Sequence, residues 1–80
     1  MYIVYALRSE VDGRIYVGMT SNLPRRFAEH NSCQVFSTKG YIPWKVIYTE
    51  VVENRKVARE REKYWKSGIG KERLKSINPR

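Results

Sequence analysis

The sequence has little with which to cross-link the chain or anchor it in a membrane. Cys33 is its only cysteine, so no disulfide can form within the chain, which is typical of a reducing compartment. No apolar stretch is long enough to cross a bilayer, and the first residues lack the basic segment and cleavage site of a signal peptide. We therefore expect a cytoplasmic protein. No motif places a base beside Cys33, so we interpret it as a loop residue.

Internal repeats are also absent. The 80 residues leave room for one small domain, which we expect to span residues 1–80. Its core is limited to one sheet and the helices that cover it. We expect no separate nucleic-acid-binding domain beside it.

Negative charge is scarce. Asp and Glu number 8 against 16 Lys and Arg, which gives a formal net charge of +8, and most of the cations lie from Arg55 onward. Such an excess attracts polyanions and gives salt-dependent affinity for phosphate backbones. A solvated basic helix face is the simpler alternative. The net imbalance leads us to expect nucleic acid as the partner.

Three runs of β-branched and aromatic residues predict strands at 2–7, 14–20 and 44–52. Asp12-Gly13 between the first two predicts a hairpin turn. The residues between 32 and 43 are mixed in character and indicate a loop.

Helices are predicted between and after these strands. Ser21 or Asn22 can cap a first helix that ends near Asn31. A second helix begins at about residue 53 and stops near Gly68, and a short third helix covers 71–77 before Pro79. The order β-β-α-β-α-α predicts an α+β fold, a three-stranded antiparallel sheet with helices packed on it.

Polar side chains fall on positions that should face inward. In a hairpin, Tyr5 and Tyr16 can share one sheet surface. On the first helix, Leu23, Phe27 and His30 form one stripe, with Arg26 one turn before His30. Each residue alone has an ordinary explanation as a rim tyrosine, a satisfied core histidine or a snorkelling arginine.

The second helix places two glutamates in different environments. Ala58, Trp65 and Ile69 define its apolar stripe, and Glu62 falls about 40° from Ala58 by the helix period, whereas Glu60 projects to solvent. A carboxylate at the edge of a packed face needs a cation, a donor or a metal. The candidate cations are Arg61, Lys66 and Arg26.

Taken together and in order, these residues resemble the GIY-YIG nuclease superfamily over nearly the whole chain. The matching motifs are Ile3-Val4-Tyr5, Tyr16-Val17-Gly18, the helix pattern Leu23, Arg26, His30 and Asn31, the strand start Pro43-Trp44-Lys45, and Glu62 with Lys66. The chain is similar to the small stand-alone branch, which resembles the catalytic module of the nucleotide-excision-repair incision subunit. It departs from the pattern in the Ile-Val-Tyr motif and in Met19, where some members have lysine.

The resemblance implies a metal-dependent endonuclease that hydrolyses phosphodiester bonds, and we expect DNA as its substrate. It implies catalytic roles for Tyr5, Tyr16, Arg26 and His30, one Mg²⁺ or Mn²⁺ on Glu62, and structural motif positions at Gly18, Leu23 and Asn31. We expect nucleic-acid contacts from Lys39, Lys45, Arg59, Lys63 and Lys66.

Tyr16 is the favoured general base, with Tyr5 and His30 in hydrogen-bonding or relay roles. Tyrosine is a poor base at neutral pH unless positive charge lowers its pKa, and we expect Arg26, His30 and the metal to supply that charge. Sequence alone leaves the choice of base open.

Two alternatives also stay open. One is a basic nucleic-acid-binding module without turnover. The other is a protein-interaction domain that docks an acidic partner through the basic second helix.

Overall fold

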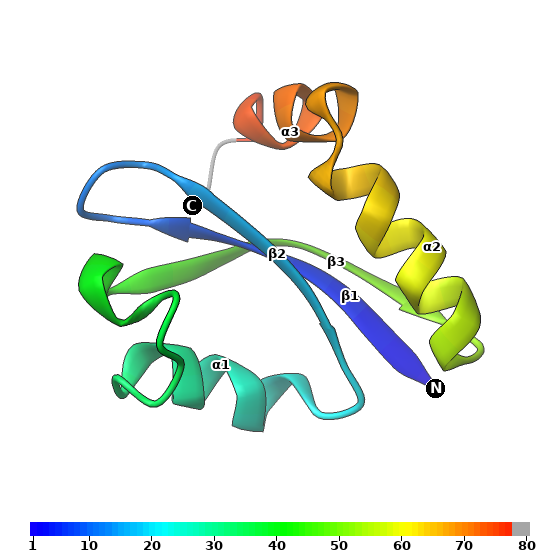
Figure 1. The fold of residues 1–80 in the computed structure, drawn as a ribbon, viewed down its shortest axis with the longest axis horizontal. Coiled ribbons are helices and arrows are strands. Elements are labelled where there is room, and N and C mark those ends of the chain that lie inside the picture. The colour runs from blue at the N-terminus through cyan, green and yellow to red at the C-terminus, as the bar shows by residue number, and fades with distance from the viewer. Residues whose placement is uncertain (78–80) are drawn as a thin grey trace.

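The strands and helices follow one another in the predicted order (Figure 1). The strands are β1 (Tyr2–Ser9), β2 (Ile15–Thr20) and β3 (Trp44–Val52); the helices are α1 (Leu23–Asn31), α2 (Arg55–Lys66) and α3 (Gly68–Lys75), with a 3₁₀ turn η1 (Lys39–Tyr41). This computed structural model describes residues 1–77. Pro79, expected after the third helix, and Arg80, one of the C-terminal cations, lie outside the described residues.

The sheet is antiparallel, as predicted, with β1 in the centre of the order β2-β1-β3. Gly13 closes the hairpin between β1 and β2 with a φ of 78°, which glycine adopts without strain. In the resulting register Tyr5 lies opposite Gly18 and Leu7 lies opposite Tyr16. Residues opposite each other on paired strands point to the same face, so Tyr16 shares the face of Leu7. Tyr5 is two residues from Leu7 along β1 and points to that face as well, so Tyr5 and Tyr16 lie on the same face.

Alternation along β1 produces two different sheet faces. Val4 and Ala6 point to one face, and Tyr5 and Leu7 point to the other. Helices α2 and α3 cover the first face, while α1 lies on the opposite side of the sheet (Figure 1). We call the first the apolar face, with its core of Val4, Ala6, Val17, Ala58, Trp65 and Leu74. We call the second the tyrosine face, with Tyr5, Leu7 and Trp44 at its centre.

The third helix begins earlier than predicted. Ser67 ends α2 and caps α3 by accepting a hydrogen bond from the Gly70 backbone N–H. A Cβ on Gly70 would overlap the Tyr64 carbonyl oxygen, so glycine allows the close turn. Because the chain turns at Ser67, Ile69 is 69% exposed, and its predicted place in the apolar stripe of α2 is wrong.

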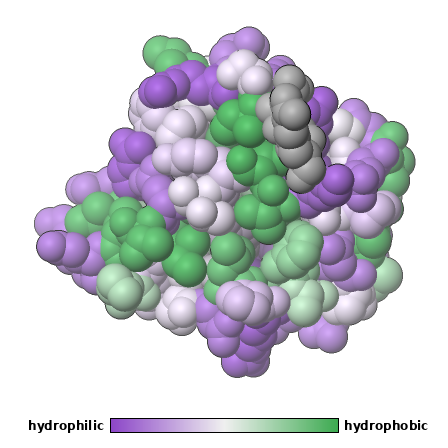
Figure 2. Space-filling model, turned by 180° about the vertical axis from the view of Figure 1, so that it is seen from behind, coloured by the Kyte–Doolittle hydropathy of each residue, from purple (hydrophilic) through white to green (hydrophobic). Residues whose placement is uncertain are grey.

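Within residues 1–77, no helix combines the length and apolar character needed to span a membrane. Figure 2 shows the side opposite to Figure 1, where apolar side chains interrupt a polar surface. The large exposed apolar residues of the described chain are Met1, Val11, Phe36, Val46, Val51 and Ile69.

Candidate active site

A chain of hydrogen bonds is buried on the tyrosine face. The Tyr5 hydroxyl lies 2.9 Å from His30 Nε2, and His30 Nδ1 lies 2.9 Å from the Thr38 hydroxyl. All three residues are at most 1% exposed. They come from β1, the end of α1 and the segment after it, so folding alone brings them together.

Gly18 makes room for the Tyr5 side chain. A Cβ at Gly18 would lie 2.6 Å from the Tyr5 hydroxyl oxygen and 3.1 Å from a ring carbon of Tyr16. The Tyr5 phenol thus lies over the bare backbone of β2. This steric demand explains why a glycine follows Tyr16-Val17.

Tyr16 completes the aromatic cluster at its outer side. Its ring centroid lies 4.8 Å from that of His30 and 6.3 Å from that of Tyr5. Unlike Tyr5 and His30, Tyr16 is only half-buried. It is therefore the phenol of the pair that solvent can reach.

Arg26 lies between this cluster and solvent. Its guanidinium donates to Glu29 with Arg26 Nη1 3.0 Å from Glu29 Oε1, and Arg25 contacts the other carboxylate oxygen at 3.3 Å. The Arg26 side chain is 37% exposed. It opens into a hollow of about 210 Å³, lined also by Thr20, Ser21, Asn22, Arg25 and Glu29. A guanidinium in this position suits bidentate contact with a phosphate.

Burial changes the pKa values of both Tyr5 and His30. Desolvation, with a smaller effect of Tyr16, raises the pKa of Tyr5 to about 12, although Arg26 acts in the opposite direction. Desolvation followed by the Arg26 charge lowers the pKa of His30 to about 4. His30 is therefore neutral at pH 7, and the expectation that it supplies positive charge to a tyrosine is not met.

Glu62 lies at the flank of α2. Trp65 and Ala58 face the sheet, and Arg61, about 60° to one side by the helix period, reaches Glu50 on the edge strand β3. By the helix period Glu62 falls on the other flank, away from β3 and therefore on the β2 side. Its charge contributes to raising the pKa of Tyr5, so the carboxylate is within electrostatic reach of that hydroxyl.

Within residues 1–77, no hydrogen bond or ion pair joins Glu62 to the four predicted catalytic residues. Among residues 1–77 its carboxylate lies 3.4 Å from Lys66 Nζ, in the i,i+4 pair that the spacing allowed, and it is 21% exposed. No cluster of three or more His, Cys, Asp or Glu side chains suited to a metal occurs in this part of the chain. A half-buried carboxylate fits an ion that takes one protein oxygen and keeps its waters, as Mg²⁺ does.

The predicted nucleic-acid contacts lie in three separate regions. Arg59, Lys63 and Lys66 are exposed and fall on the Glu62 side of α2 by the helix period. Lys39 is exposed in η1, on the α1 side of the sheet.

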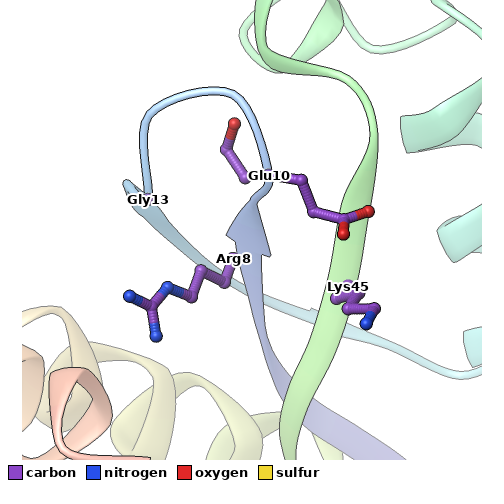
Figure 3. A pocket seen from close by; sticks show the side chains of 5 residues that line it. Arg8, Glu10, Gly13 and Lys45 are labelled. Carbon is purple, nitrogen blue, oxygen red and sulfur yellow. The ribbon is translucent and has the colours of Figure 1, made fainter. Parts of the chain in front are cut away.

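Lys45 lies elsewhere. It pairs with Arg8 across the strands and points away from buried Trp44, so it does not share the tyrosine face. With Arg8, Glu10 and Gly13 it lines a hollow of about 360 Å³ at the hairpin end, where the heads of Arg8 and Lys45 diverge (Figure 3). This hollow is larger than the one beside Arg26 but contains none of the catalytic candidates.

The predicted motif positions have clear structural roles. Leu23 packs with the tyrosine-face cluster. Asn31 binds the start of β3 through both ends of its amide: Asn31 Oδ1 accepts from the Trp44 N–H at 2.7 Å and Nδ2 donates to the Trp44 carbonyl at 3.2 Å. Asn31 thereby links α1 to β3.

Sequence reasoning missed two residues of this site. Glu29, which holds Arg26, was detectable as an acid three positions along the same helix. Thr38, which binds His30, lies in an irregular segment whose sequence has no periodicity that points to it.

Comparisons with known proteins agree with this geometry. The model of the GIY-YIG catalytic domain matches residues 1–75. A UPF0213 protein of Clostridium perfringens is 37% identical over 79 residues, which cover 98% of this chain and 84% of that protein. A UPF0213 protein of Natronomonas pharaonis is 37% identical over 82% of this chain and 78% of its own length.

The human structure-specific endonuclease subunit SLX1 is 31% identical over the full chain, which spans 31% of that protein. No solved structure matches. The family match covers both tyrosine motifs, Arg26, His30 and Glu62, and the chain belongs to the GIY-YIG nuclease superfamily.

Proposed function

We propose that this chain is a metal-dependent endonuclease that hydrolyses phosphodiester bonds in DNA. The observation that carries the proposal is Arg26, a half-exposed guanidinium that opens into a hollow beside the buried pair of Tyr5 and His30. The net charge of +8 supports a polyanionic substrate. The name of the human relative, a structure-specific endonuclease subunit, supports the same class of reaction.

Arg26 is the residue proposed to bind the scissile phosphate. Glu29 occupies one side of its guanidinium, and the remaining N–H groups are available to phosphate oxygens. A fixed guanidinium at this point stabilises negative charge that grows on the phosphate in the transition state.

Tyr16 is the proposed proton acceptor for the attacking water. Tyr5 holds its proton because its pKa is about 12. His30 is fully buried, and both of its ring nitrogens have partners, so it has no free atom to offer to water. Tyr16 is the member of the cluster that solvent can reach.

Glu62 is the proposed ligand of one Mg²⁺ or Mn²⁺, because it offers a half-buried carboxylate on the β2 side of α2. When bound, such an ion neutralises charge on the phosphate and stabilises the leaving oxygen. In this proposal the protein itself supplies the Glu62 carboxylate for the ion and the Arg26 guanidinium for the phosphate.

The test is nicking of supercoiled plasmid with Mg²⁺ or Mn²⁺, alongside single-stranded, branched and RNA substrates. Glu62→Gln and Arg26→Gln are each expected to lower nicking by at least about 100-fold, since each removes a charge that stabilises the transition state. Glu60→Gln is the matched control, because it makes the same change on the exposed side of the same helix.

Three outcomes would contradict the proposal in different ways. Full activity of folded Glu62→Gln would remove the metal assignment. Cleavage of RNA alone would remove DNA as substrate. Salt-dependent binding without nicks at any protein concentration would favour the binding module over the nuclease.

A further inference from the structure

We propose that Thr38 is a positioning residue that selects the tautomer of His30 and, through it, the direction of the hydrogen bond from Tyr5. The inference deepens the proposed nuclease function and rests on it for its catalytic consequence. Its structural part concerns protons and can be measured without any substrate.

The Thr38 hydroxyl is held in place from several sides. The residue is 1% exposed, and its carbonyl accepts a hydrogen bond from the Trp44 indole at 2.9 Å. Its hydroxyl donates to the Val35 carbonyl at 3.3 Å and lies 2.9 Å from His30 Nδ1. The hydroxyl has a single proton to donate. The Val35 carbonyl can only accept, so we assign the hydroxyl proton to that bond, and the Thr38 oxygen then accepts from His30.

This arrangement determines the state of the imidazole. Burial holds the pKa of His30 well below 7, at about 4, so the ring carries one proton at neutral pH. Thr38 requires that proton on Nδ1, which leaves Nε2 as an acceptor. Tyr5, 2.9 Å from Nε2, must then be the donor in that bond.

The direction of the Tyr5 bond matters for Arg26. When the Tyr5 O–H donates its hydrogen bond to His30, only lone pairs of the Tyr5 oxygen remain for other neighbours. Arg26, whose pKa is raised mainly by Glu29 and also by Tyr5, can only donate. In the opposite tautomer the Tyr5 proton would be free to face the guanidinium, donor against donor. Thr38 thereby favours a guanidinium held at the edge of the hollow.

Two variants test this inference. Thr38→Val keeps the branched shape and removes the hydroxyl, whereas Thr38→Ser keeps the hydroxyl. Thr49→Val is the control, since it makes the same chemical change at an exposed position on β3. The main readout is ¹⁵N NMR of the imidazole, which distinguishes Nδ1–H from Nε2–H. Plasmid nicking is measured in parallel.

We expect Nδ1–H in the wild type, in Thr38→Ser and in Thr49→Val, and a shift toward Nε2–H in Thr38→Val. Nicking by Thr38→Val should fall by roughly tenfold or more in kcat with little change in KM, because His30 loses a buried partner and the Tyr5 bond reverses. Thr38→Ser should recover most of that loss.

An Nε2–H tautomer in the wild type would overturn the inference, and so would an unchanged tautomer in folded Thr38→Val. Should Thr38→Val fail to fold, the wild-type tautomer decides. A wild-type protein that nicks no substrate would refute the nuclease proposal instead, while the NMR result would still show whether Thr38 sets the tautomer.

Discussion

The two faces of the sheet are built from alternate residues of the same strand and differ in what holds them. On the apolar face, Val4 and Ala6 pack against α2 and α3 through hydrocarbon and indole surfaces. On the tyrosine face, Tyr5 buries a phenol against His30 and Thr38, and each buried polar atom has a partner. Throughout residues 1–77 no buried side-chain nitrogen or oxygen lacks one.

The difference suggests that one face of the sheet mainly stabilises the fold and the other mainly positions the residues proposed to act in cleavage. Burial of apolar area is non-directional and supplies most of the favourable free energy. Buried hydrogen bonds contribute less net stability, but they are costly to leave unmade and so hold side chains in one arrangement. Changes on the apolar face should therefore affect mainly the free energy of unfolding, and changes on the tyrosine face should affect cleavage more than stability.

The largest expected effect on stability comes from the apolar face. Leu74 on α3 is fully buried, and Leu74→Ala should lower the free energy of unfolding by about 2–5 kcal/mol through lost burial and a cavity. Urea unfolding followed by circular dichroism measures it. Cleavage per folded molecule should stay close to that of the wild type. If Leu74→Ala lowered cleavage and left the free energy of unfolding unchanged, the apolar face would not be the one that mainly determines stability.

The next largest effect is a loss of stability at acidic pH, and it comes from His30 on the tyrosine face. The pKa of His30 is about 4 in the folded protein and 6.5 unfolded, so between these values the unfolded chain binds more protons. The free energy of unfolding should therefore fall as the pH drops from 6.5 to 4, by up to roughly 3 kcal/mol. Urea titrations across this range measure it, and His30→Gln should flatten the dependence.

Glu50 gives the comparison on the apolar side. Hydrogen bonds from Arg61, Tyr48 and Trp65 lower its pKa to about 2. Stability from Glu50 is therefore present above 4.5 and is lost as the pH falls toward 2. Glu50→Gln should remove the pH dependence of stability in this lower range only. If Glu50→Gln changed the pH dependence between 4 and 6.5 that is assigned to His30, or if His30→Gln changed the lower range assigned to Glu50, the assignment of the two groups would be wrong.

Much of the fold was predictable because local signals agreed with the tertiary structure. The strands, the Asn22 cap of α1 and the end of α2 near Gly68 follow from residue type and period. The start of α3 was predicted too late because glycines at 68 and 70 are poor helix formers. Ser67 capping and the close packing of Gly70 override that preference.

The site was predictable to the extent that it lies on regular elements. Tyr5, Tyr16 and His30 share one cluster because strand and helix periods place them there. The partner of His30 in the irregular segment was not predictable, since no period relates Thr38 to the helix. The neutral state of His30 was also unpredictable, because it depends on burial that only the packed structure defines.

The smallest expected effect on stability tests the contact between the Tyr5 ring and Gly18. In Gly18→Ala the new Cβ would lie 2.7 Å from Tyr5 Cζ, so the ring must move, at a cost of about 1–3 kcal/mol in the free energy of unfolding. Cleavage should fall further than stability, because the displaced phenol leaves His30. Gly40→Ala is the control, as a Cβ there meets nothing within 4 Å. In a Tyr5→Leu background the cost of Gly18→Ala should largely disappear, and equal costs in both backgrounds would show that Gly18 is not there for the Tyr5 ring.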